Sequence, residues 1–195
     1  MGWTSRALHA ALSGVLIFGL GGCARNTAPN GPSNDDVTQP VEPLPMIHTE
    51  GTRWVDANGQ EVLLKGVNLG NWLLQEFWMM GQSTEAVNDQ CTLEALLIER
   101  FGVAEKERLM THFRDHWMTE RDWDLLASFG FNVVRLPFIY HLLEDEETPY
   151  TLREDAWVRL DEALREAEAR GMYVILDLHG VVGSQWDQHT TGCEG

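Results

Sequence analysis

Strand-like and helix-like segments alternate along most of the chain, and this order limits the folds that are open to it. Helical periodicity separates three short apolar segments that are typical of strands. The expected strands cover residues 64–69, 132–137 and 173–179, and the expected helices cover 92–101, 104–117, 119–129 and 154–170. Strands that alternate with helices predict a right-handed parallel α/β architecture. The third strand is almost continuously apolar, as expected of a strand buried on both faces.

A β-hairpin is predicted ahead of the first of these strands. Residues 52–55 and 61–64 have strand character, and the dipeptide Asn58-Gly59 lies between them. Asn-Gly favours the positive φ values of a tight turn, so we expect the two segments to pair.

Two of the expected helices show a distinct apolar side. Thr119 is a suitable N-cap with Asp122 three residues later, and Trp123, Leu126 and Phe129 follow at helical spacing. In the last helix we expect a buried stripe at helical spacing. It consists of Trp157, Leu160, Leu164 and Ala167.

Polar side chains stand at the carboxyl ends of all three predicted strands. Asn68 ends the first, Arg135 lies in the second, and Asp177 and His179 end the third. In parallel α/β folds this edge carries the chemistry, because the loops converge there. A glycine-rich phosphate loop follows none of the strands, which disfavours a nucleotide site.

The charge of the chain excludes one class of partner. The formal net charge is −16, from 30 acidic and 14 basic residues among 195. Duplex nucleic acid requires a basic surface, so we expect no nucleic-acid partner. A neutral substrate is compatible with such a surface, whereas a polyanionic one would be repelled.

The first 47 residues predict a targeting signal and a flexible tether rather than a folded domain. Residues 1–22 have the features of a lipoprotein signal peptide, and Leu20-Gly21-Gly22-Cys23 resembles a bacterial lipobox. Cys23 is then the lipidation site; a plain signal peptide with a chance cysteine is the alternative. Residues 23–47 are proline-rich and predict a flexible tether, which leaves 48–195 as the domain. We therefore expect a bacterial cell-envelope protein, lipid-anchored at the outer membrane or cell surface, or else secreted.

Three sequence blocks resemble glycoside hydrolase family 5, in particular its exo-β-1,3-glucanase and related β-glucanase branch. They are GVNLGNWLLQEFWM (66–79), HWMTERDWDLLASFGFNVVRLPF (116–138) and VILDLHGVVGSQ (174–185). The resemblance implies a (β/α)8 TIM barrel, of which the chain holds about the first three βα units after the hairpin.

The resemblance also implies an activity. Members hydrolyse O-glycosyl bonds of β-glucan-type polysaccharides or oligosaccharides with retention, using two glutamates and neither cofactor nor metal. The acid/base glutamate follows an asparagine in this family, and no Asn-Glu dipeptide occurs in the sequence. We therefore expect the amino-terminal portion of a longer enzyme, inactive and aggregation-prone on its own.

Site residues follow from the same resemblance. Arg135 corresponds to an arginine that orients the nucleophile carboxylate. His179 corresponds to a histidine that donates a hydrogen bond to the sugar or to the region of the catalytic carboxylate. A rim salt bridge and a structural histidine are the respective alternatives. Glu76 and Asn68 are candidates for binding sugar hydroxyls. Trp186 is the preferred stacking platform, with Trp72 and Trp78 as further candidates. We expect Asp177 to be structural.

The oxidation state of two cysteines remains open. Cys91 and Cys193 fall in loops that we place at the same edge, where they either pair as a disulfide or stay free thiols.

Two alternative functions also remain open. One is a non-catalytic glycan-binding envelope lipoprotein, and the other is a metal-dependent barrel hydrolase that uses Asp177 and His179.

Overall fold

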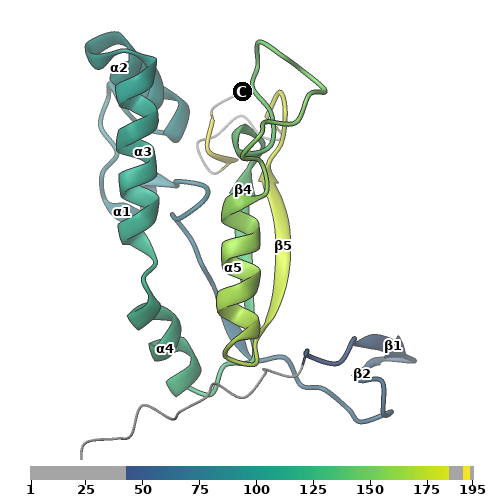
Figure 1. Ribbon diagram of the computed structural model, residues 1–195. Helices are drawn as coiled ribbons and strands as arrows, with labels where there is room; N and C mark the ends of the chain where they lie inside the picture. The colour runs from purple at the N-terminus through teal and green to yellow at the C-terminus, as the bar shows by residue number, and fades with distance from the viewer. Residues whose placement is uncertain (1–42, 185–190, 194–195) are drawn as a thin grey trace, which may run out of the picture. The chain divides into compact units, whose positions relative to one another are not determined.

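A three-stranded parallel sheet forms the centre of the fold. The computed structural model describes residues 43–184 and 191–193. The strands are β3 (Gly66–Asn68), β4 (Val133–Ile139) and β5 (Tyr173–Gly180), in the order β3-β4-β5. Figure 1 shows α5 (Val158–Glu168) lying along β4 and β5. The predicted parallel order of strands and helices is confirmed.

Helices fill the connection between β3 and β4. Figure 1 labels them α1 (Phe77–Met80), α2 (Gln90–Phe101), α3 (Val103–Trp117) and α4 (Glu120–Ser128). The short 3-10 turn η1 (Tyr140–Leu142) follows β4 directly. Among the residues that the structure describes, no helix is long and apolar enough to cross a membrane.

The predicted cap of α4 is present, whereas its apolar side is shorter than expected. Thr119 and Asp122 form a capping box. Trp123 is buried, but Phe129 is exposed because the helix ends at Ser128 and Phe129 is its C-cap. The expectation that Phe129 lines the apolar face is therefore wrong.

The last helix begins later than the sequence indicates. Residues 154–157 form a turn, and α5 starts at Val158. Leu160, Ala163 and Ala167 are buried, while Trp157 and Leu164 are exposed. The spacing of three and four residues from Leu160 defines the buried side, and Trp157 lies outside the helix; the predicted stripe is wrong at both exposed positions.

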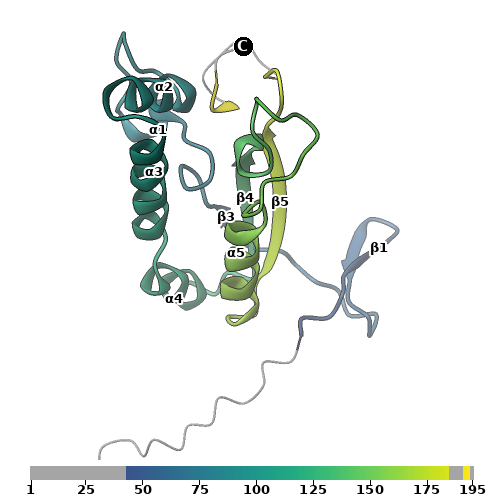
Figure 2. The ribbon, with the colours of Figure 1, turned by 45° about the horizontal axis from the view of Figure 1, so that its top comes forward.

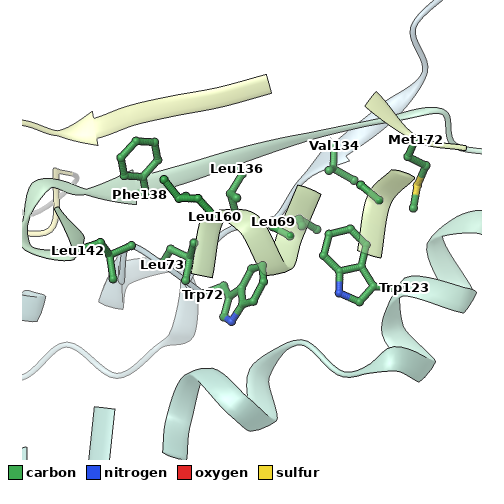
Figure 3. Close-up of a cluster of buried hydrophobic side chains, with 12 residues drawn as sticks. Leu69, Trp72, Leu73, Trp123, Val134, Leu136, Phe138, Leu142, Leu160 and Met172 are labelled. Carbon is green, nitrogen blue, oxygen red and sulfur yellow. The ribbon is translucent and has the colours of Figure 1, made fainter. Parts of the chain in front are cut away.

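The core lies between the sheet and the helices that pack on one of its faces. Figure 3 shows Trp72 and Trp123 beside side chains of β4, and their ring centroids are 6.2 Å apart in an edge-to-face arrangement. Three alternate residues of β4 belong to this core, namely Val134, Leu136 and Phe138. Leu160 of α5 also contributes to it.

The outer strands are more exposed than their sequences suggest. All three residues of β3 are exposed, and in β5 Ile175, Leu176 and Leu178 are more than 40% exposed. Within the described residues each of these strands pairs with β4 alone. The prediction that the third strand is buried on both faces is therefore wrong for this structure.

The hairpin pairs different segments from those predicted. β1 (His48–Glu50) pairs with β2 (Arg53–Val55), while Glu61 makes only an isolated bridge to Val55. The Asn58-Gly59 turn does form, because the Asp56 carboxylate accepts hydrogen bonds from the backbone nitrogens of Asn58 and Gln60 at 2.9 and 2.8 Å. A strand does not follow it.

Candidate active site

Four polar side chains from the three parallel strands meet at one face of the sheet. Arg135 is in register with Asn68 and Ile175, and side chains alternate along a strand. Arg135, Asp177 and His179 therefore project on the face opposite to Leu136 and the core. Arg135 donates to the Asp177 carboxylate, and its Nη1 lies 3.4 Å from Asn68 Oδ1.

His179 completes this group. Its Nδ1 lies 3.1 Å from Asp177 Oδ2 and 3.3 Å from Arg135 Nη2. Because the guanidinium can only donate, Nδ1 accepts in its contact with Arg135 Nη2, which places the ring proton on Nε2. Asp177 thus holds the guanidinium, and the guanidinium holds the imidazole.

Glu76 occupies a tight turn after β3. Asn71 adopts a left-handed conformation with φ 62°, and its Oδ1 accepts a 2.7 Å hydrogen bond from the Glu76 nitrogen. The Glu76 side chain is buried, and its Oε1 accepts from Trp78 Nε1 at 3.2 Å. Glu76 is therefore a held carboxylate and not a solvated loop acid. Among the described residues, the Glu76 carboxylate is hydrogen-bonded to Trp78 and not to Arg135.

The tryptophan candidates lie in different environments. Trp72 is 1% exposed, and its Nε1 donates to the Arg114 carbonyl oxygen at 3.0 Å, so it belongs to the core and offers no stacking face. Trp78 is 54% exposed. Trp186 and Cys23 lie outside the described residues.

A disulfide and several hydrogen bonds hold the segment after β5. Cys91 in α2 is bonded to Cys193, with a Cα–Cα distance of 5.1 Å. Gly180 and Gly192 pack too closely for a side chain, since a Cβ on Gly180 would lie 2.5 Å from the Thr191 carbonyl oxygen. Figure 2 shows this segment at the same end of the sheet as the loop that follows β4.

Sequence reasoning missed a second polar group beside this loop. The Tyr140 hydroxyl donates to Glu146 Oε1 at 2.5 Å, and His141 Nε2 lies 3.5 Å from the same oxygen. These bonds, that of Tyr140 first, lower the pKa of Glu146 below its ordinary value. Burial raises the pKa of Tyr140, and the bond to Glu146 adds to that effect. A tyrosine and a histidine directly after a strand, with an acid-rich loop behind them, were the available signal.

A metal centre at Asp177 and His179 gains no support from the geometry. Among the described residues, the single cluster of three histidine, cysteine or carboxylate donors lies elsewhere, at Cys91, His141 and Cys193. The short contacts of Asp177 and His179 are instead with each other and with Arg135.

Comparison with known proteins shows which family the chain is similar to. Residues 101–193 match the model of the cellulase family, glycosyl hydrolase family 5. A "Beta-xylosidase" of Phanerodontia chrysosporium is 31% identical over 142 residues, covering 73% of this chain and 29% of the relative. A "Probable glucan 1,3-beta-glucosidase A" of Emericella nidulans is 34% identical over 133 residues, covering 68% and 32%. The crystal structure of rutinosidase from Aspergillus niger superposes with a TM-score of 0.55 at 25% identity, covering 67% of this chain and 37% of that one.

The chain thus spans about a third of the length of the curated relatives it matches. These relatives come from fungi. The expected location, a lipid-anchored protein of a bacterial cell envelope, is therefore wrong.

Proposed function

Because the chain belongs to glycosyl hydrolase family 5 over the residues that match it, we propose that the protein hydrolyses O-glycosyl bonds of β-glucan-type polysaccharides or oligosaccharides with retention of configuration. The observation that carries the proposal is the group of Arg135, Asp177 and His179 at one face of the parallel sheet. In this proposal β3, β4 and β5 are the first three strands of a (β/α)8 barrel.

The retaining mechanism assigns defined tasks to these residues. It requires two carboxyl groups about 5–5.5 Å apart, one as nucleophile and one as acid/base. Arg135, held by Asp177, presents a fixed positive charge that keeps a neighbouring nucleophile carboxylate ionised and oriented. His179 acts as a hydrogen-bond donor to the sugar or to the region of the catalytic carboxylates.

Glu76 and Trp78 form the proposed sugar-binding part of the site. A carboxylate accepts hydrogen bonds from sugar hydroxyls, and an exposed indole face packs against the apolar face of a pyranose. The hydrogen bond from Trp78 Nε1 to Glu76 Oε1 orients the two groups relative to each other. The names of the relatives, a glucosidase and a xylosidase, are consistent with a neutral β-linked substrate.

Activity of the intact protein tests the proposal. It should release sugar from at least one of three substrates, namely β-1,3-, β-1,4- and β-1,6-linked glucan, and proton NMR should show the β-anomer first. Arg135→Ala should abolish turnover, whereas Arg108→Ala, which removes an exposed arginine paired with Glu105, should not change it. Binding of glucan without hydrolysis would overturn the proposal and favour a glycan-binding protein.

A further inference from the structure

Three donor side chains with affinity for soft metals converge beside the loop that follows β4. Cys91 lies in the first turn of α2, His141 in η1, and Cys193 in the segment after β5. Their donor atoms all lie within 4.8 Å of one another, and all three side chains are partly buried. In the structure the two sulfur atoms are joined as a disulfide.

Contacts other than the disulfide keep the two cysteines together. The Cys91 nitrogen donates to the Gly192 carbonyl oxygen at 3.2 Å. The hydroxyls of Ser184 and Thr191 both donate to the Cys193 carbonyl oxygen, at 3.2 and 3.1 Å. Breaking the sulfur–sulfur bond therefore leaves both sulfur atoms beside His141.

We propose that Cys91, Cys193 and His141 form a redox-gated site for Zn²⁺: closed as a disulfide when oxidised, and open to the metal when reduced. Two thiolates and an imidazole are ligands that Zn²⁺ prefers, with bonds of about 2.3 Å to sulfur and about 2.0 Å to nitrogen. A tetrahedral ion with such bonds places its donors roughly 3.5 Å apart. Only small adjustments within the 4.8 Å cluster are required.

The surroundings favour anionic sulfur ligands and place a carboxylate behind the histidine. Cys91 lies in the first turn of a 12-residue helix, where the helix dipole stabilises a thiolate ligand. Cys91, His141 and Glu146 line one cavity of about 480 Å³. Glu146 Oε1 lies 3.5 Å from His141 Nε2, and a metal-bound histidine commonly donates its other N–H to a carboxylate.

The chemistry balances with a phosphine as reductant. The phosphine gives two electrons to the disulfide and takes an oxygen atom from water, forming a phosphine oxide and two thiols. Binding of Zn²⁺ then replaces the two thiol protons, which pass to the buffer, and forms two Zn–S bonds. A small-molecule disulfide, which takes up two electrons and two protons to become two thiols, restores the protein disulfide and expels the ion.

Cobalt(II) is the probe, because thiolate ligation gives it a strong near-ultraviolet charge-transfer absorption and visible bands of tetrahedral geometry. The intact protein is reduced with phosphine, desalted without oxygen and titrated with Co²⁺, then with Zn²⁺ as competitor. We expect one equivalent to bind after reduction, to be displaced by Zn²⁺, and not to bind before reduction.

Variants identify the ligands. Cys91→Ser and Cys193→Ser should each remove the charge-transfer band or reduce its intensity. His141→Gln, which leaves both thiols in place, should weaken Co²⁺ binding at least tenfold, and Glu146→Gln should weaken it roughly 10–100-fold. His112→Gln, on the exposed side of α3, is the matched control. Absence of the band in reduced protein, or equal affinity in His141→Gln and His112→Gln, would overturn the proposal; circular dichroism of each variant separates lost binding from lost folding.

Discussion

The imidazole of His179 and the carboxylate of Asp177 are two residues apart in β5 and in contact, with Nδ1 3.1 Å from Oδ2. Residues at this spacing project from the same face of a strand. Arg135 of the neighbouring strand donates to the same carboxylate. Asp177 is therefore the residue through which β4 and β5 hold their two functional groups in a fixed relative position.

Replacing Asp177 by asparagine tests this role. The amide has nearly the same shape but no charge, so the guanidinium loses the counter-ion that holds it beside the imidazole. Because displacement of positioned groups by about 1 Å costs about 10²-fold, kcat/KM of the intact protein should fall by about that factor. Asp124→Asn is the matched control, since Asp124 of α4 pairs with Arg170 in the turn after α5, away from the site. A kcat/KM within twofold of the unsubstituted protein would contradict the assigned role.

Two leucines of α5 test the corrected packing of that helix. Leu160 is 1% exposed and Leu164 is 40% exposed. Leu160→Ala should lower the free energy of unfolding by about 2–5 kcal/mol, because it leaves a cavity beside the core shown in Figure 3. Leu164→Ala should change it by no more than about 0.5 kcal/mol. Denaturant titration of both variants measures the difference, and equal losses would restore the stripe read from the sequence.

The order of the fold could be predicted from the sequence because periodicity and caps are local signals. Thr119 and Asp122 indicated the start of α4, and the apolar segments indicated β4 and β5. Burial could not be predicted in the same way, since it depends on which elements lie alongside. Leu176 and Leu178 are apolar and α5 lies along β5, yet both side chains are more than 40% exposed.

The candidate site was predictable only in part. Polar residues at strand ends pointed to Arg135 and His179, because the carboxyl ends of parallel strands share an edge. The contacts of Asp177 with both Arg135 and His179 became visible only in the structure. From the sequence, an aspartate two positions before a histidine could equally form a salt bridge elsewhere in the barrel. The sequence could not show that Trp72 is buried and Trp78 exposed, because both tryptophans lie in the same short apolar block and have similar neighbours.

The capping box of α4 predicts a pH dependence of stability. Hydrogen bonds from the Thr119 hydroxyl and backbone nitrogen, at 2.6 and 2.9 Å, lower the pKa of Asp122 below its ordinary 3.8. The folded-state pKa is lower than the unfolded one, so this contribution is present above pH 3.8 and is lost as the pH falls through the folded-state pKa.

Urea titrations of the unsubstituted protein and of Asp122→Asn, from neutral pH to below pH 3.8, measure this contribution of Asp122 to stability. The difference in unfolding free energy should be largest near neutral pH and should shrink in acid. Thr119→Ala should cost about 1 kcal/mol at neutral pH. Glu120→Gln, in the same helical turn, controls for the change in charge; a pH-independent difference for Asp122→Asn would contradict the assignment.

The disulfide predicts a large effect of reduction on stability. Cys91 and Cys193 are 102 residues apart, and a crosslink over such a distance restricts the unfolded chain strongly. The double variant Cys91→Ser/Cys193→Ser should lose about 2–5 kcal/mol of unfolding free energy. Mass spectrometry should show a gain of two hydrogen atoms on reduction of this bond. No gain in mass, or an unchanged melting temperature, would show that the thiols do not pair in solution.

The exposed face of β5 predicts how the 195-residue chain behaves alone. Leu176 and Leu178 are 45% and 42% exposed, and they alternate along β5 with Asp177 and His179. They lie on the face that α5 covers at β4, beside an unpaired strand edge in the described part of the chain. The chain should therefore self-associate as its concentration rises, as light scattering after size exclusion can measure.

Leu176→Lys/Leu178→Lys should reduce this association, because burying two ammonium groups between copies costs solvation that apolar contact does not return. Leu164→Lys, an equally exposed leucine on α5, should leave it unchanged. In the intact protein the same double substitution should instead lower stability, since further barrel elements are proposed to cover this face. A monomeric 195-residue chain that unfolds cooperatively would show that the face needs no cover and would contradict the prediction.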